Sequence, residues 1–452
     1  MNFKRGILAL NFLAFSIVNS FTQQLEADKL IIGSPPYLSI EKTEIINQSL
    51  AETIVESLSL EEKANQLIMA RFNKALNIKN EWELEEALGK ESANYGGILF
   101  LGWDFRDSIK TFDKLQEICS YLNRAPIKPF IALDEEPRFA YLVDDNLEDF
   151  LNERAIEFVM KYFGRFHKQE IEIPGSNPIF KSRLPLQEEL FKKHRSLPKD
   201  RKEEFLDDYS RDFVYGKAET AYRAGINTIL GPNLDIVSDV DSKSLMMAVQ
   251  GRTYGDNVDI IQRFGNAYGE GINLFYEETG IKLIWVPKHF PGLGATTIAE
   301  DPHNHKTIIN KSFNELLEYD IKVYEPILKN APAIMIGHGI YPVLDDVPAS
   351  VSYIIDNYLR NDLGYRGRTI PDADDMGGLF GVENLMKKIL ENNALTLSLS
   401  YPPEKRQDQI IEALTPKKIN ERVLDIIEWK LEHGLIDVNY FLEKNYGISF
   451  TP

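Results

Sequence analysis

Short apolar runs rich in Ile, Val, Leu and Phe alternate along the chain with longer amphipathic or charged stretches. Strands of a parallel sheet are buried on both faces and read as nearly continuous apolar runs, and each needs a crossover, usually helical, before the next strand. The alternation therefore predicts βα units around a parallel sheet. About eight runs have this character, at residues 66–72, 97–101, 129–133, 228–231, 282–286, 333–337, 368–371 and 395–399.

Eight alternations in one chain suit a closed TIM-type (β/α)8 barrel better than an open sheet. Helical signals fall between the apolar runs. A pattern from Leu58 to Ala64 follows Ser57, and Ser312 with Glu315 forms a capping box at the start of another helix. No internal repeat or low-complexity linker marks a second folded domain. We therefore expect a single-domain α/β barrel over residues 50–440.

One stretch breaks this alternation. Residues 141–216 contain no strand-like run and are dominated by charged helical segments such as 199–208. Barrels accept insertions in the loops that follow their strands, so we predict a helical insertion within the barrel. Its mixed charge run is more typical of a solvated helix face than of a binding patch.

The N-terminus has the three-part order of a secretory signal. Lys4 and Arg5 precede an apolar run from Gly6 to Val18, and polar residues follow. The run is shorter than the ~20 residues that a membrane-spanning helix needs. We expect residues 1–22 to be removed on export and the mature protein to be periplasmic or secreted, with no stable membrane insertion. A buried N-terminal helix is the alternative interpretation.

Composition narrows the function classes. The 452 residues include 51 Lys and Arg against 69 Asp and Glu, and the net charge of -18 argues against nucleic acid as a partner, because phosphate binding rests on clustered basic residues. The single cysteine, Cys119, excludes an internal disulfide and a Cys-rich zinc cluster. The sequence has no glycine-rich nucleotide motif after a strand and no P-loop, so no cofactor is expected.

Candidate chemistry gathers at the ends of the predicted strands. In a barrel, residues at strand carboxyl ends and in the loops that follow share one face, so side chains distant in sequence converge there. Three acids and four of the seven histidines stand at such positions, and they are Asp134, Asp235, Asp372, His289, His303, His305 and His338. Strand-end carboxylates suit a nucleophile or a substrate hydroxyl acceptor, and an acid such as Asp235 also suits a helix cap.

The segment from Lys288 to Gly294, KHFPGLG, resembles the Lys-His-Phe-Pro-Gly-His-Gly motif of family 3 glycoside hydrolases, in their single-domain β-N-acetylhexosaminidase branch. Other landmarks follow the order of that branch. They are GPNLD at 231–235, RTYGD at 252–256, and the run from Gly364 to Asp372 that leads to the nucleophile of the family. The resemblance covers about residues 52–435 apart from the insertion, and it implies a glycosidase built on one barrel.

The resemblance also implies roles for the matching residues. Asp372 matches the nucleophile, whose attack on the anomeric carbon would form a glycosyl-enzyme and make the enzyme retaining. Asp301 and His303 match an Asp-x-His pair, in which the carboxylate orients an imidazole that acts as general acid and base. The implied sugar-binding residues are Asp134, Arg138, Arg252, Lys288 and His289. The implied activity is removal of terminal β-linked N-acetylhexosamine (GlcNAc) from peptidoglycan-type or other glycans, without a metal.

Five positions depart from the family pattern, and they are Leu293, Ala295, Pro302, Pro371 and Ala373. These changes leave Asp372 and His303 in place but alter residues expected to surround the substrate. A catalytically weak or inactive barrel that binds carbohydrate is therefore one alternative. A β-glucosidase or phosphorylase of the same family is another. A metal-dependent hydrolase is a third, because Asp301, His303 and His305 offer zinc ligands at alternating positions.

Overall fold

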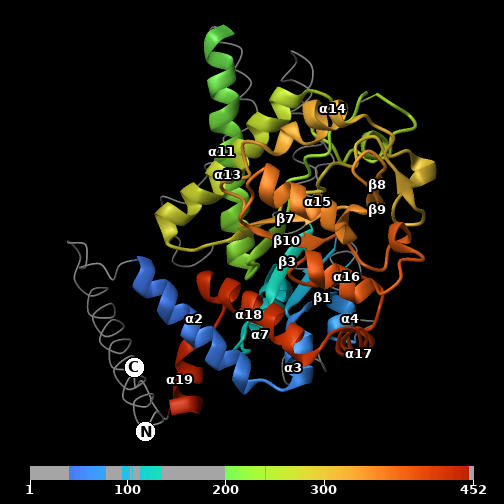
Figure 1. Ribbon diagram of the computed structural model, residues 1–452. Helices are drawn as coiled ribbons and strands as arrows, with labels where there is room; N and C mark the ends of the chain where they lie inside the picture. Colours follow the sequence, from blue (N-terminus) through green and yellow to red (C-terminus); the bar gives the residue numbers. More distant parts are fainter. Residues whose placement is uncertain are drawn as a thin grey trace.

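The computed structural model describes residues 40–77, 94–101, 104, 112–134, 199–239 and 241–446 (Figure 1). The predicted signal segment 1–22 and Arg138 lie outside these residues, as does the 141–198 part of the predicted insertion. The remaining part of the insertion belongs to one long helix, α11 (Lys199–Ala224), as its charged helical pattern predicted.

All eight predicted apolar runs contain a strand. The strands are β1 (Ile68–Arg71), β2 (Gly97–Phe100), β3 (Phe130–Asp134), β4 (Thr228–Leu230), β5 (Ile284–Trp285), β7 (Ala333–Ile336), β10 (Arg368–Pro371) and β11 (Thr396–Ser398). Within the described ranges, six of them form one parallel sheet in the order β11-β1-β2-β3-β4-β5, and β10 pairs in parallel with β7. The predicted α/β fold with a parallel sheet is confirmed.

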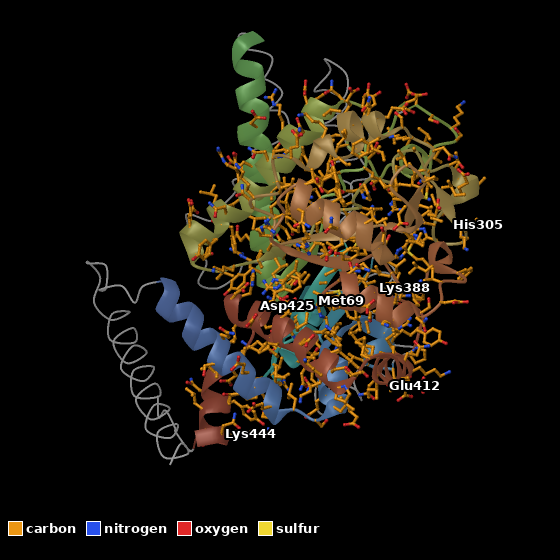
Figure 2. The ribbon with its side chains drawn as sticks, in the orientation of Figure 1. Met69, His305, Lys388, Glu412, Asp425 and Lys444 are labelled. Carbon is orange, nitrogen blue, oxygen red and sulfur yellow. The ribbon has the colours of Figure 1, made fainter. Side chains whose placement is uncertain are left out.

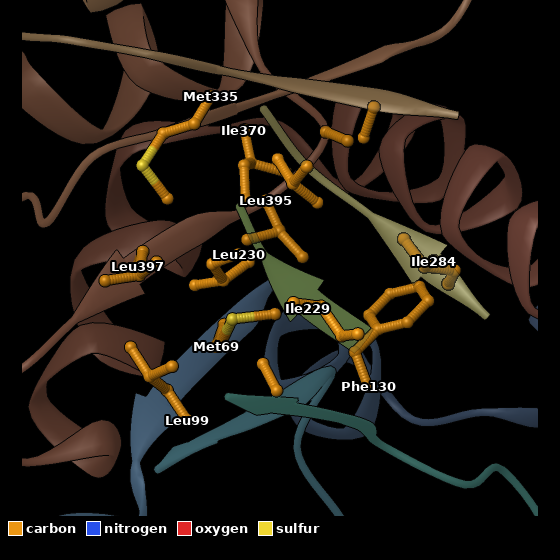
Figure 3. Close-up of a cluster of buried hydrophobic side chains, with 14 of the residues drawn as sticks. Met69, Leu99, Phe130, Ile229, Leu230, Ile284, Met335, Ile370, Leu395 and Leu397 are labelled. Atoms are coloured by element: carbon orange, nitrogen blue, oxygen red, sulfur yellow. The ribbon is translucent and has the colours of Figure 1, made fainter. Parts of the chain in front are cut away.

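Backbone hydrogen bonds join these two sheets at both of their edges. Beyond β5, the Phe290 N–H donates to the Met335 carbonyl of β7 at 2.8 Å. Beside β11, the Ala394 N–H donates to the Thr369 carbonyl of β10 at 2.8 Å. Side chains from all eight strands share one buried cluster (Figure 3), which includes Met69, Leu99, Phe130, Ile229, Ile284, Met335, Ile370 and Leu397.

Helices surround the strands. Besides α11 they are α2 (Ile40–Ser57), α3 (Leu60–Gln66), α4 (Phe72–Ala75), α7 (Phe112–Leu122), α12 (Met246–Val249), α13 (Val258–Thr279), α14 (Phe313–Glu315), α15 (Tyr353–Asn357), α16 (Leu385–Asn392), α17 (Pro403–Ala413), α18 (Pro416–Glu432) and α19 (Val438–Tyr446). In Figure 1, α11 lies beside α13, and α2 lies against α18 although the two are distant in sequence. None of the helices in the described ranges is both long and apolar enough to cross a membrane.

The N-terminal cap of α3 differs from the sequence prediction. α3 begins after Ser59, whose hydroxyl accepts the Glu62 N–H at 3.1 Å while the Glu62 carboxylate accepts the Ser59 N–H at 2.7 Å. A helix starting just after Ser57 is therefore wrong, because Ser57 ends α2. At the other end of α3, Gln66 accepts a hydrogen bond from buried Lys430 of α18 at 2.7 Å, which ties the C-terminal helices to the start of β1.

The segment after Ser312 is less regular than predicted. Its capping box with Glu315 is present, but the helix continues as a π-helical turn at Leu316–Asp320 and a 3-10 turn at Lys322–Tyr324. Tertiary contacts override helix propensity here, since Asp320 is buried and accepts a hydrogen bond from Lys311 at 2.5 Å. A small sheet that the sequence pattern did not predict is formed nearby by β6 (Thr307–Ile308), β8 (Gly339–Tyr341) and β9 (Asp345–Pro348).

Candidate active site

Charged side chains gather just beyond the carboxyl ends of β3, β5 and β10. Asp134 is the last residue of β3, Lys288 follows β5, and Asp372 follows β10. The Lys288 ammonium donates to the Asp134 carboxylate, although the two are 154 positions apart in the chain, and the Lys288 side chain is 1 % exposed. The structure thus brings two of the predicted sugar-binding residues into direct contact.

A histidine joins two carboxylates at the same edge. His289 Nδ1 lies 2.7 Å from Asp235 Oδ2, and His289 Nε2 lies 3.8 Å from Asp372 Oδ2. His289 and Asp235 are buried, whereas the Asp372 side chain keeps 17 % of its exposure. Because a carboxylate can only accept, the contact with Asp235 places a proton on His289 Nδ1, and the ring then has its Nε2 edge toward Asp372.

Asp235 also fixes the backbone of the loop after β5. Its Oδ1 accepts the Leu293 N–H at 2.7 Å and the His289 N–H at 3.4 Å. A buried carboxylate is stable only when it is paired and hydrogen-bonded, and this loop supplies its donors. The interpretation of Asp235 as a helix cap is wrong, because these side-chain partners lie in the loop after β5.

His338 is fully buried and interacts electrostatically with Asp372. Its Nε2 is 2.8 Å from the Ala373 carbonyl oxygen, and its Nδ1 is 2.8 Å from the Ser350 hydroxyl. Since a carbonyl can only accept, Nε2 carries a proton and the Ser350 hydroxyl can donate to Nδ1. Burial lowers the pKa of His338, against the opposing pull of the Asp372 charge. His338 therefore serves as a buried link between β7 and the residue that follows Asp372.

The electrostatic surroundings keep Asp372 ionised. Burial raises the pKa of its carboxyl, but electrostatic interactions with His289, His338 and His303 lower it. The Ala373 N–H donates to Asp372 Oδ1 at 2.7 Å and lowers it further. The net effect is a pKa below the ordinary aspartate value. Asp372 is an anion at neutral pH, which is the form that a carboxylate nucleophile needs.

Asp301 and His303 pair in the loop between the 3-10 turn Ile298–Glu300 and β6. Asp301 Oδ1 lies 2.6 Å from His303 Nδ1 and accepts the His303 N–H at 2.9 Å. The His303 side chain is 46 % exposed. The contact at Nδ1 orients the ring and leaves Nε2 as the nitrogen that can exchange a proton with a bound molecule. The structure thus confirms that the predicted Asp-His pair is formed.

One of the four candidate histidines does not join the site. His305 is exposed at the rim of the molecule (Figure 2). Its N–H donates to the Asp301 carbonyl at 2.9 Å, so the tight turn that forms the pair leaves His305 outside it. The expectation that all four histidines converge is therefore wrong for His305. In the parts of the chain that the structure describes, no group of three or more His, Cys, Asp or Glu side chains could hold a metal ion.

Arg252 lies in a turn that is bonded to the segment after β4. The neighbouring Thr253 hydroxyl donates to the Asp235 carbonyl at 2.6 Å, and Arg252 Nη1 donates to Gln250 at 3.2 Å. This turn therefore sits beside the same strand edge as His289. Arg138, the remaining predicted sugar-binding residue, lies outside the described residues.

The two acids that follow Ala373 have structural partners elsewhere. Asp374 pairs with Arg406 of α17 at 2.6 Å, and burial raises the pKa of its carboxyl to about 7. Asp375 accepts the N–H groups of Leu399 and Ser400 at 3.2 and 2.5 Å. Both acids hold the region after β11 in place, so Asp372 is the carboxylate of this run that faces the histidines.

Sequence reasoning missed a small apolar cluster beside the site. It is separate from the main core and contains Val237, Met246, Met247, Ala248 and Leu293. Leu293 occupies the position at which the family motif has a histidine, and its backbone is the one that Asp235 holds. The signals available in the sequence were the adjacent methionines at 246–247 and the leucine at 293 in place of a histidine, because methionine commonly fills irregular apolar packing.

Comparison with known proteins places this geometry in context. Residues 194–425, more than half of the chain, match the glycosyl hydrolase family 3 N-terminal domain. β-Hexosaminidase A of Pseudoalteromonas piscicida is 26 % identical over 227 residues, which cover 44 % of this chain and 36 % of that protein. An uncharacterized secreted glycosyl hydrolase of Arthroderma benhamiae is 32 % identical over 158 residues, which cover 34 % of this chain and 42 % of that protein. The matches thus span less than half the length of these relatives.

The fold is also similar to solved structures. A family 3 β-N-acetylglucosaminidase from a Paenibacillus species superposes with a TM-score of 0.55 and 18 % sequence identity. The match covers 88 % of this chain and 65 % of that protein. At this level of identity the likeness concerns the fold.

The two Asp-His pairs should contribute differently to stability. Asp235→Ala removes the acceptor of three buried N–H groups and should cost roughly 2–4 kcal/mol of unfolding free energy. Asp301→Ala removes the partner of a half-exposed ring and should cost less than about 1 kcal/mol. Urea unfolding at pH 7 measures both values. Equal losses in the two variants would contradict the role of Asp235 as the buried anchor of the site.

Proposed function

The chain belongs to glycosyl hydrolase family 3, and we propose that it is a retaining glycosidase that removes terminal β-linked N-acetylhexosamine (GlcNAc) from peptidoglycan-type or other glycans. The observation that carries the proposal is the ionised Asp372 carboxylate, which interacts electrostatically with His303, a half-exposed ring oriented by Asp301. Double displacement at an anomeric carbon needs a carboxylate nucleophile and a proton donor. The names β-hexosaminidase and β-N-acetylglucosaminidase of the similar proteins support the choice of sugar.

The proposed reaction has two steps. In the first, an Asp372 oxygen attacks the anomeric carbon while His303 gives its Nε2 proton to the glycosidic oxygen, so the bond to the leaving group breaks and a glycosyl ester forms. In the second, neutral His303 removes a proton from water, whose oxygen attacks the same carbon and releases Asp372. Asp301 keeps the ring oriented and supports its positive charge before the first step and after the second.

The residues around Asp372 are proposed to hold the sugar. Lys288 and Asp134 form a partly buried ion pair, in which the exposed part of the Asp134 carboxylate suits hydroxyl groups, and His289 extends from Asp235 toward Asp372. Arg252 is held beside the same segment through Thr253. These groups are fixed by the fold before a ligand arrives, which reduces the entropy lost on binding. From its motif position, Arg138 is proposed as a further sugar-binding residue.

We further propose that the eight strands close into a (β/α)8 barrel that spans about residues 50–440, with an insertion at 141–216. The hydrogen bonds from Phe290 to Met335 and from Ala394 to Thr369, which link the sheets at both edges, support closure. A shared core with side chains from all eight strands supports it as well (Figure 3). Active sites of such barrels lie at the carboxyl ends of the strands, where Asp134 and Asp372 stand.

A weakly active or inactive barrel that binds carbohydrate is the second candidate. Leu293 favours it, because this side chain packs in an apolar cluster at a position where the family motif has a polar ring. Turnover of 4-nitrophenyl N-acetyl-β-glucosaminide separates the two candidates. The matching glucoside, assayed with and without phosphate, tests for a β-glucosidase or a phosphorylase.

Asp372→Asn should reduce turnover by about 10³-fold or more, because an amide cannot form the glycosyl ester. Mass spectrometry after treatment with a 2-fluoro glycosyl probe should find the label on the peptide that contains Asp372. Asp375→Asn is the matched control, since Asp375 bonds the backbone after β11, and it should keep most of the activity. Label on Asp375, or full activity in Asp372→Asn, would contradict the assignment.

His303→Gln should slow the release of poor leaving groups far more than that of a 2,4-dinitrophenyl group, which departs without protonation. General acid catalysis contributes ~10²- to 10⁴-fold, so a loss of this size is expected for an alkyl glycoside. Steady-state kcat/KM values for a series of aglycones measure the effect. His305→Gln, two residues away but at the exposed rim, should behave like the unaltered protein. Equal losses for good and poor leaving groups would exclude His303 as the acid.

We also propose that the protein is exported, because Lys4 and Arg5 precede the apolar run from Gly6 to Val18 in signal-peptide order. The secreted glycosyl hydrolase among its relatives supports this proposal. N-terminal sequencing of the protein from the periplasm or culture medium should find a chain that begins near Phe21 or Gln23. A cytoplasmic protein that retains residues 1–20 would refute it.

A further inference from the structure

The loop that carries the Asp-His pair is attached to the turn that follows the candidate nucleophile. The Gly377 N–H donates to the His303 carbonyl at 2.9 Å, and the Gly378 N–H donates to the Pro302 carbonyl at 2.8 Å. Both glycines belong to the buried 3-10 turn Gly377–Leu379, a few residues beyond Asp372. Two consecutive amides of this turn thus bind the carbonyls of two consecutive loop residues, Pro302 and His303.

This attachment matters because the His303 ring is not held by burial. Its side chain is 46 % exposed, so packing does little to restrict it. The loop turns tightly around Asp301, whose carbonyl accepts the N–H groups of Asn304 at 3.0 Å and His305 at 2.9 Å. Those bonds are local and fix only the shape of the loop. The bonds from Gly377 and Gly378 fix its position relative to Asp372.

The close approach of the two segments requires glycine at position 377. A Cβ added to Gly377 would lie 2.2 Å from the Asn304 carbonyl carbon and 2.6 Å from the His305 nitrogen. Both are backbone atoms, so any side chain at position 377 must push the loop away. The next residue differs, because a Cβ added to Gly378 would lie 2.8 Å from the Cβ of His338. His338 is the buried ring that bonds the Ala373 carbonyl.

We propose that Gly377 is a positioning residue for proton transfer: by lacking a side chain, it lets its backbone amide hold the loop of His303 at the distance from Asp372 that protonation of the leaving group requires. Gly378 performs a separate task, since the absence of a side chain there leaves room for the Cβ of His338, whose ring bonds the residue after Asp372. The inference rests on the proposed function, because it assumes that His303 is the acid. It assigns the spacing between acid and nucleophile to Gly377 and the room for His338 to Gly378.

The test compares Gly377→Ala with Gly378→Ala, two variants that add the same methyl group one residue apart. Gly377→Ala should lower kcat/KM for an alkyl N-acetyl-β-glucosaminide by ~10²-fold, because a displacement of about 1 Å is enough to impair a positioned group. For the 2,4-dinitrophenyl glycoside, kcat/KM reports formation of the glycosyl-enzyme without protonation of the leaving group, so it should change less than about fivefold, and the rate at which a 2-fluoro probe with the same leaving group labels Asp372 should be preserved. Gly378→Ala should lower kcat/KM for both substrates by similar factors. Adding His303→Gln to Gly377→Ala should cause little further loss on the alkyl glycoside.

Gly216→Ala controls for the added methyl group, since a Cβ at this helical position meets no atom within 4 Å, and it should leave all rates unchanged. Amide hydrogen exchange in the unaltered protein tests the attachment without a variant, because the Gly377 and Gly378 N–H groups should be protected. Rapid exchange at both amides, or equal losses on both substrates in Gly377→Ala, would overturn the inference. Failure of the proposed function is recognised separately, as absence of turnover by the unaltered protein or full activity in Asp372→Asn.

Discussion

The Asp235 carboxylate is fully buried against the loop after β5. It accepts hydrogen bonds from the Leu293 backbone and from the ring and backbone of His289. A buried carboxylate is stable only when hydrogen-bond donors compensate its charge. The same hydrogen bonds hold the donor groups in one position. The consequence is that His289 is aimed at Asp372 and that Lys288, one residue before it, meets Asp134. The positions of the side chains around Asp372 therefore depend on Asp235, a buried acid that is not itself expected to contact the reacting atoms.

The site contains the same chemical pair twice in two different environments. Asp235 and His289 are buried, so their hydrogen bond is strong and their geometry is fixed. Asp301 and His303 are partly exposed, so the ring can exchange protons with a ligand or water. A group that must change its protonation state in each catalytic cycle suits the exposed position, whereas a group that only has to orient others suits the buried one. The exposed pair then needs support from the backbone, which the turn after Asp372 provides.

Backbone amides perform much of this support. The Ala373 N–H bonds Asp372, the Leu293 N–H bonds Asp235, and the Gly377 N–H bonds the His303 carbonyl. Backbone donors have little freedom to rotate, so they hold a carboxylate or a loop more rigidly than a long side chain would. The altered motif positions are compatible with this arrangement: Ala373 keeps the amide that bonds Asp372, and Leu293 keeps the amide that bonds Asp235.

The sequence by itself determined the eight strands, their α/β order and the residues that stand at the strand ends. Each strand is a short apolar run bounded by polar segments, and that local contrast is visible without any tertiary information. The motif order also selected Asp372, His303 and Asp301 as candidate catalytic residues before any contact was known. Local signals were less informative where packing overrides propensity, as in the helix that breaks after Ser312.

Only the tertiary structure decided which of these residues share a site. It separated His305 from the other histidines, assigned Asp374 and Asp375 to the region after β11, and gave Asp235 a partner in the loop after β5 instead of a helix to cap. It also revealed that glycines after the nucleophile contact the loop of the acid, which no local pattern predicts. The physical reason is that strand ends and loops are set by local sequence, whereas the direction of each side chain depends on distant segments that fill the space around it.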